Sequence, residues 1–216
     1  QEGLAKVELM VDDGSGYKAI PMYDNGSNGD PVAGDSLFTG TIPTKGAGTL
    51  VKYYAIATDL IGQTDKWPND APSEYHAYTV DYKLPALRIT ELMAVNNTTI
   101  TDEAGEYDDW FEIQNTGTVA VNLKDMYVSN ALNSTKTFKL PNFILAAGAT
   151  VLLWADSDQE QGPLHTNFSL SADGESVALF ETINHGNVMV HGWKYGLMGD
   201  DVTMDLSQTT PQRRII

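Results

Sequence analysis

The sequence predicts an all-β protein made of two tandem β-sandwiches. Short segments of alternating polar and apolar residues recur along the 216 residues, separated by Gly, Pro, Asn and Asp. Short strands at this spacing are typical of sandwiches. A chain of this length is long enough to bury two small cores. Pro85 cannot donate a ladder hydrogen bond, so we expect one domain over 1–82, a second over 86–206 and a tail over 207–216.

The first half of the chain is expected to form one such sandwich. Its first segment alternates before Asp12-Asp13-Gly14-Ser15-Gly16, a run of residues that favour turns. The strands predicted on the same grounds span residues 6–11, 17–23, 36–42, 49–59 and 74–80.

The second half reads as one strand after another. Asp173-Gly174 accepts the positive φ angles of a tight hairpin turn, which predicts a hairpin between the strands on either side. The strands predicted here span residues 87–95, 109–115, 119–123, 126–129, 136–139, 149–155, 167–171, 175–181 and 187–193.

The centre of the chain carries the run 108–115, Asp-Asp-Trp-Phe-Glu-Ile-Gln-Asn. Its alternation places Trp110 and Glu112 on one side of a strand and the apolar Phe111 on the other. Three further stretches stand out: Ile-Thr-Glu-Leu-Met-Ala-Val-Asn at 89–96, His-Thr-Asn-Phe-Ser-Leu at 165–170 and Ala-Asp-Gly-Glu at 172–175.

Together these four stretches resemble the lamin-tail domain, an immunoglobulin-like β-sandwich that also occurs in secreted and surface proteins of bacteria. The resemblance implies that the second sandwich is lamin-tail-like. It also implies a structural role for the matching residues, which are Glu91, Asn96, Asp109, Trp110, Glu112, Asn115, His165, Asn167, Phe168, Gly174 and Glu175. Residues 1–82 are similar to the immunoglobulin-like or fibronectin-like modules that precede lamin-tail domains, on the runs 21–26 and 51–59.

Composition excludes several classes of function. Thirteen Lys and Arg stand against 29 Asp and Glu, which gives a formal charge of −16 and opposes binding to nucleic acids or anionic lipids. The chain has no cysteine, so disulfides, thiolate zinc sites and cysteine nucleophiles are excluded. Because no apolar run approaches about 18 residues, we expect no membrane insertion.

The strongest candidate for a bound ion is the loop 24–35. It offers the oxygen ligands of Asp24, Asn28, Asp30 and Asp35 together with three glycines, and calcium prefers such ligands on a backbone that curls. The spacing partly matches an EF-hand loop, but Gly26 occupies the third position, where a ligand is expected. The alternative is a loop whose side chains hydrogen-bond its own backbone.

Glu91 and Glu112 form a second candidate pair because each alternates in phase with apolar residues, Ile89 and Met93 beside Glu91 and Trp110 beside Glu112. Such carboxylates must be hydrogen-bonded, paired or shifted in pKa, and two of them could serve as a general acid and base. The lamin-tail resemblance implies a structural role instead, with backbone amides and Asn96 or Asn115 as the expected partners.

Histidine and aromatic residues give weaker signals. Among the four histidines, only His185 and His191 lie close enough in sequence for a shared zinc site, and we expect His165 to hold the loop that enters a strand. Trp67 lies in a predicted loop, where it either contacts a ligand or caps the core of its own module. The local motifs of nucleophilic elbows, phosphate loops and zinc proteases are missing.

The sequence therefore predicts a non-enzymatic adhesion or spacer module, a piece of a larger exported bacterial protein. Neighbouring domains of the same polypeptide, a surface protein or a glycan are the candidate partners, and no cofactor other than Ca²⁺ is expected. Bacterial lamin-tail domains occur beside secreted hydrolases, which implies an accessory role. The alternatives are a carbohydrate-binding accessory module of a secreted hydrolase and an enzyme that uses Glu91 and Glu112.

Overall fold

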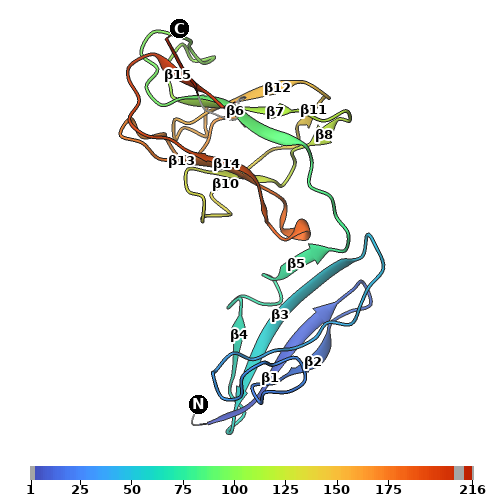
Figure 1. Cartoon of the computed structure of the whole chain (residues 1–216). Coiled ribbons are helices and arrows are strands. Elements are labelled where there is room, and N and C mark those ends of the chain that lie inside the picture. Colours follow the sequence, from blue (N-terminus) through green and yellow to red (C-terminus); the bar gives the residue numbers. More distant parts are fainter. Residues whose placement is uncertain (1–2, 207–211, 216) are drawn as a thin grey trace. The chain divides into compact units, whose positions relative to one another are not determined.

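The computed structural model describes residues 3–206 and 212–215, and its strands pair in an antiparallel manner (Figure 1). This confirms the all-β class. Contacts divide the chain into two compact units: unit 1 comprises Gln1–Tyr82 with Ile183–Gly186, and unit 2 comprises Lys83–Thr182 with Asn187–Ile216. One short 3₁₀ helix, η1, spans Ile183–His185. No helix in the described part of the chain has the length and apolar character needed to cross a membrane.

Unit 1 is built on one sheet. Its strands run in the order β2 (Lys18–Met22), β1 (Leu4–Asp12), β3 (Leu50–Asp59) and β4 (Thr64–Trp67), while β5 (His76–Thr79) also pairs with β3. The edge strand β2 contains Pro21, and β4, which shares the opposite edge with β5, contains Asp65 and Lys66.

The core of unit 1 is small. Leu9, Val11 and Val51 are buried on one face of the sheet, and partly buried side chains such as Ile20 and Ile42 surround them. The predicted strand over 36–42 is wrong, because Thr39 makes only an isolated bridge to Tyr23. A second sheet is not seen among the described residues of this unit, so its assignment as an immunoglobulin-like module is not confirmed.

Unit 2 contains two larger sheets and a strand pair. The first sheet has the order β12 (Thr150–Trp154), β7 (Trp110–Asn115), β6 (Leu87–Met93), β15 (Val202–Asp205) and β16 (Gln212–Ile215). The second has the order β10 (Phe138–Lys139), β9 (Tyr127–Ser129), β13 (Ser176–Phe180) and β14 (Met189–Lys194), and β8 (Val121–Asn122) pairs with β11 (Ile144–Leu145).

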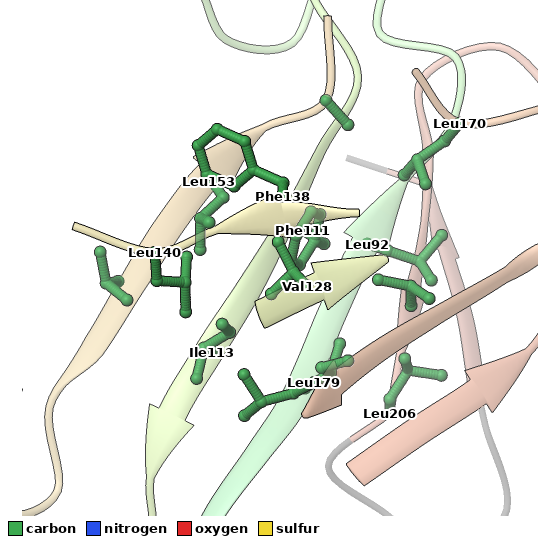
Figure 2. Packing of buried hydrophobic residues seen from close by; sticks show 14 of the residues in the cluster. Leu92, Phe111, Ile113, Val128, Phe138, Leu140, Leu153, Leu170, Leu179 and Leu206 are labelled. Atoms are coloured by element: carbon green, nitrogen blue, oxygen red, sulfur yellow. The ribbon is translucent and has the colours of Figure 1, made fainter. Parts of the chain in front are cut away.

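The core of unit 2 lies between these two sheets (Figure 2). Strand alternation sends Phe111 and Ile113 inward from β7, and Phe111 faces Leu92 on β6 and Leu153 on β12 in register. Val128 on β9 and Leu179 on β13 meet them from the second sheet. The strand β13 is buried on both faces, which explains its nearly unbroken apolar sequence.

Several predicted elements of unit 2 differ from the structure. Residues 167–171 are not a strand, because Ser169 makes only an isolated bridge to Asp156. Gly174 does occupy a turn, with φ of 102°, but the turn is not a hairpin because β13 pairs with β9 and β14. A side chain at Gly174 would lie 2.8 Å from the carbonyl oxygen of Tyr195, so only glycine fits.

The predicted tail over 207–216 contains a strand. Gln212–Ile215 form β16 and pair with β15, which had not been predicted either. Residues 207–211 and 216 lie outside the described residues.

Candidate functional site

Two motif asparagines hold loops at the ends of the central strands. Asn115 is fully buried, and its side chain donates to the carbonyl oxygens of Val119 and Leu145 while accepting from the Gly117 amide. Asn96 similarly donates to the carbonyl oxygens of Ile100 and Asp108. Each amide therefore satisfies backbone groups that burial would otherwise leave unpaired.

Glu91 and Glu112 are brought together as direct cross-strand neighbours of β6 and β7. A bulge between Ile89 and Glu91 shifts the register, so Ile89 faces the core while both glutamates lie half-buried on the outer face. Burial, and then the charge of Glu91, raise the pKa of Glu112. Asp205 lies opposite Glu91 on β15 and extends the row of acids across a third strand.

Two expectations about this pair were wrong. Ile89 does not share the face of Glu91, because the extra residue of the bulge moves it to the opposite side of the sheet. Asn96 and Asn115 were expected as partners of the glutamates, but their side chains bind backbone groups of the loops instead.

The loop 24–35 brings its three predicted aspartate ligands together. Carboxylate oxygens of Asp24, Asp30 and Asp35 lie within 4.8 Å of one another, and Asn28 adopts a φ of 58° in the same loop. Asp24 accepts hydrogen bonds from the amides of Gly34, Asp35 and Ser36 at 2.6, 3.1 and 3.0 Å. Asp30 is buried and accepts from the amide of Gly26 at 2.7 Å. Calcium at this loop stays a prediction.

A second cluster of ligand groups surrounds His165 in unit 2. The His165 side chain is 1% exposed, and its Nδ1 makes a short hydrogen bond to Asp156, the second residue after β12. Its Nε2 lies 3.2 Å from Oε1 of Glu103, whose side chain is 62% exposed. The backbone fixes the ring, because His165 forms a bridge with Trp154 and the Thr166 amide donates to the Trp154 carbonyl.

Asp102 completes this cluster from the loop between β6 and β7. One ligand atom each from Asp102, Glu103 and His165 lie within 4.8 Å of one another. Asp102 Oδ1 accepts the amide of Glu106 at 2.8 Å, which closes a tight turn over 102–106. Within the described residues, Asp102 Oδ2 is buried and has no hydrogen-bond partner. Asp102, Glu106 and Asp108 form an overlapping group of three carboxylates.

Charge is concentrated around this cluster. Burial raises the pKa of Asp108, and the nearby charges of Asp156, Asp102 and Glu106 raise it further. Burial lowers the pKa of His165, but the carboxylates of Asp156 and Glu103 outweigh it and raise the net value.

Asp109 lies one residue further along the same loop. Burial raises its pKa to about 6, although the amides of Leu170 and Asn96 favour the ionised form. Its carboxyl group is therefore costly to keep charged in the folded protein.

The sequence did not indicate this cluster as a metal site. Its members come from two loops, with His165 about 60 residues after Asp102 and Glu103, so no local spacing reveals them. The only available signal was the acid-rich stretch around Asp102, together with His165 in its motif. Spacing suggested His185 and His191 as zinc ligands instead. Of these two, His191 has a structural contact, because its Nδ1 accepts a hydrogen bond from the Ile89 amide at 3.1 Å. No group of three ligands in the described ranges contains His185 or His191.

The other motif residues support packing and turns. Trp110 is buried with Met93 and Trp154 in a small cluster on the outer face of the first sheet. Phe168 stacks on Phe111 in the main core. The remaining contacts are from Asn167 to the carbonyl oxygen of Thr137, and from Asn130 to Oε1 of Glu175.

Unit 1 carries a row of aromatic rings over β4, β3 and β5. Trp67 is 60% exposed and stacks on His76 with 4.0 Å between ring centroids. His76 in turn packs against Tyr53, which contacts Tyr78. Tyr53 and Tyr78 pack against the core of unit 1, and Trp67 is the exposed end of this row, where it borders a shallow hollow that Ala55 and Ala57 also line.

Comparison with known proteins identifies the family. Residues 82–196, more than half of the chain, match the model of the Lamin Tail Domain family. The chain belongs to this family. The eleven motif residues of this lamin tail domain, from Glu91 to Glu175, all lie within the matched region, and the sandwich of unit 2 has the fold expected of it.

Individual relatives of this lamin tail domain protein are distant. No curated protein matches it. One similar solved structure is that of a DUF4876 family protein from Bacteroides thetaiotaomicron VPI-5482, with 13% sequence identity and a TM-score of 0.31. The match covers 84% of this chain and 63% of that one, so the chain spans less than two thirds of that protein's length. At this TM-score the similarity supports no functional argument.

Proposed function

We propose that this lamin tail domain protein is a non-catalytic structural and interaction module of a larger exported bacterial protein. The setting of Glu91 and Glu112 carries the proposal. They are the acid pair that the sequence offered for acid-base catalysis, and they lie directly opposite each other on neighbouring strands of a sheet face. General acid-base catalysis requires groups that converge on a substrate in a concave site.

A cavity in unit 1 supports the same proposal. It has a volume of about 440 Å³, Val7, Met22 and Phe38 contribute to its lining, and neither glutamate borders it. The motif polar residues support a structural role as well, since Asn96 and Asn115 bind backbone groups. Export and attachment to further domains are inferred from the lamin-tail resemblance.

An activity screen tests the proposal. The purified chain should show no turnover above buffer with chromogenic glycosides, phosphoesters and carboxylic esters, with or without added Zn²⁺. Turnover that disappears in both Glu91→Gln and Glu112→Gln would overturn the proposal and support the enzyme alternative. Both variants keep the size of the side chain, so loss of activity would not reflect loss of packing.

A second candidate, a carbohydrate-binding accessory module, is favoured by the aromatic row of unit 1. Sugar rings stack on exposed aromatic side chains, and Trp67 offers a ring of this kind beside the hollow bordered by Ala55 and Ala57. Affinity electrophoresis through soluble polysaccharides measures this directly. Retardation of the wild type that is lost in Trp67→Ala, but kept in the control Tyr23→Ala, would establish the carbohydrate module.

A further inference from the structure

We propose that Asp102, Glu103 and His165 bind a divalent transition-metal ion such as Zn²⁺, and that this ion joins two loops at one end of the lamin-tail sandwich. The three residues supply one nitrogen and two oxygen ligands within 4.8 Å of one another. Zinc is bound in proteins by this combination of imidazole and carboxylate groups.

The hydrogen bond from His165 to Asp156 fixes which ring nitrogen faces the site. In the neutral ring, Nδ1 carries the proton that it shares with Asp156, so Nε2 presents its lone pair toward Glu103. A carboxylate that orients a histidine in this way is the usual outer partner of a metal-binding imidazole. Asp156 would have that role here.

The separation of His165 and Glu103 fits two ligands on one ion. Their Nε2 and Oε1 atoms lie 3.2 Å apart but do not form a well-aligned hydrogen bond. Two ligands bound to zinc at about 2.0–2.2 Å, separated by the tetrahedral angle, lie roughly 3.3–3.5 Å from each other. A lone pair and a carboxylate at this distance repel each other unless a cation lies between them.

Asp102 provides independent evidence that a cation binds here. Its Oδ1 is occupied by the Glu106 amide, while Oδ2 is buried and has no hydrogen-bond partner in the described part of the chain, although Asp102 as a whole is only 8% exposed. An unpaired buried carboxylate oxygen is costly. A metal ion would satisfy it.

Gly162 lies directly beside the two ligands Glu103 and His165. A Cβ at this position would lie 3.2 Å from both Glu103 Oε1 and the Cδ2 atom of His165. Any other residue at Gly162 would therefore crowd the two ligands at the point where they approach each other.

Isothermal titration of the metal-stripped chain with ZnSO₄ tests the site. We expect binding of one ion in the wild type, at least tenfold weaker binding in Glu103→Gln, and a similar loss in Asp102→Asn. Glu103 is exposed, so its substitution should leave the fold intact, and a thermal melt without metal checks this. Glu160→Gln, which removes an exposed charge from the segment that carries His165 but is not a proposed ligand, is the matched control and should bind as the wild type does.

Glu106→Gln separates this site from the overlapping group of three carboxylates. The proposal requires Glu106→Gln to keep wild-type affinity within about twofold, and a tenfold excess of Ca²⁺ to leave zinc bound. It is overturned if the wild type binds no zinc, if Glu103→Gln binds as tightly as the wild type, or if only Glu106→Gln loses affinity. In the first of these cases, a proton on His165 alone would hold Asp156 and Glu103 together.

Discussion

Two clusters in this protein each gather three possible ligand residues within 4.8 Å, yet they use their carboxylates differently. In the loop 24–35, Asp24 accepts three backbone amides and Asp30 accepts that of Gly26. In the cluster around His165, Asp102 leaves one buried oxygen without a hydrogen bond among the described residues. Backbone amides of the loop 24–35 thus hydrogen-bond to the carboxylates of that loop, whereas the cluster around His165 leaves one carboxylate oxygen without a hydrogen bond among the described residues. Clustered acids therefore do not by themselves indicate a metal site.

The largest effect is expected where a polar side chain is fully buried and both its donor and its acceptor atoms make hydrogen bonds. Replacing Asn115 by Ala leaves the carbonyl oxygens of Val119 and Leu145 and the amide of Gly117 without their partner. We expect unit 2 to lose about 3 kcal/mol in the free energy of unfolding. Urea denaturation measures this loss. The control, Asn122→Ala, removes an exposed asparagine and should cost less than about 1 kcal/mol; equal losses would contradict the assigned role.

Asp24→Ala should destabilise unit 1 by about 2 kcal/mol, because three amides lose a charged acceptor in a partly exposed loop. Asp35→Ala removes one such bond, to the Leu37 amide, and should cost about half as much. If the backbone alone compensates these acids, melts in 1 mM Ca²⁺ and in chelator coincide. A rise with Ca²⁺ that is absent in Asp24→Ala would instead make this loop the ion site.

Asp102→Asn should stabilise the metal-free protein, in contrast to the two destabilising substitutions above. The variant keeps the acceptor for the Glu106 amide and removes a buried charge, so we expect a gain of about 1 kcal/mol in chelator. With zinc present, the same variant should be less stable than the wild type, because a ligand is lost. Paired melts in chelator and in ZnSO₄ show whether this reversal occurs. Destabilisation in chelator would mean that Asp102 is already satisfied.

The last effect concerns the pH dependence of stability. The folded-state pKa of Asp109 is about 6, against a reference of 3.8, so the folded protein holds this proton more tightly than the unfolded chain. The stabilisation this gives is complete below pH 4 and is lost as the pH rises to 6. Asp109→Asn removes this contribution, so its melting temperature relative to the wild type should be higher at pH 7 than at pH 4. A constant difference across this range would contradict the assigned pKa.

Alternation in the sequence predicted the strands whose faces differ most in burial. The strands β6, β7 and β12 lie within the predicted segments, because their inward residues, such as Phe111 and Leu153, must be apolar to fill the core. The strand prediction failed where an apolar pattern occurs outside a strand and where a strand has no such pattern. Residues 36–42 contain apolar side chains but remain largely unpaired, while β4, with the sequence Thr-Asp-Lys-Trp, has no apolar face that a pattern could reveal.

Local spacing revealed the acidic group of the loop 24–35 but not the cluster around His165, and the reason is physical. The group of Asp24, Asp30 and Asp35 lies within twelve consecutive residues, so the sequence itself brings its members together. Asp102 and His165 meet only because β7 and β12 pair antiparallel, which aligns the loop before β7 with the loop after β12. A one-residue bulge likewise determines the face of Ile89, and strand periodicity alone cannot predict an inserted residue.

The edge strands of unit 1 affect how this protein behaves when crowded. An edge strand with free amides and carbonyls can recruit a strand from another molecule, which begins aggregation. On β2, Pro21 has no amide hydrogen to offer, and β4 is only four residues long, with Asp65 and Lys66 in its middle. Both β2 and β4 are therefore poor templates for an incoming strand. These two strands should accordingly not nucleate aggregation of unit 1 when the protein is concentrated.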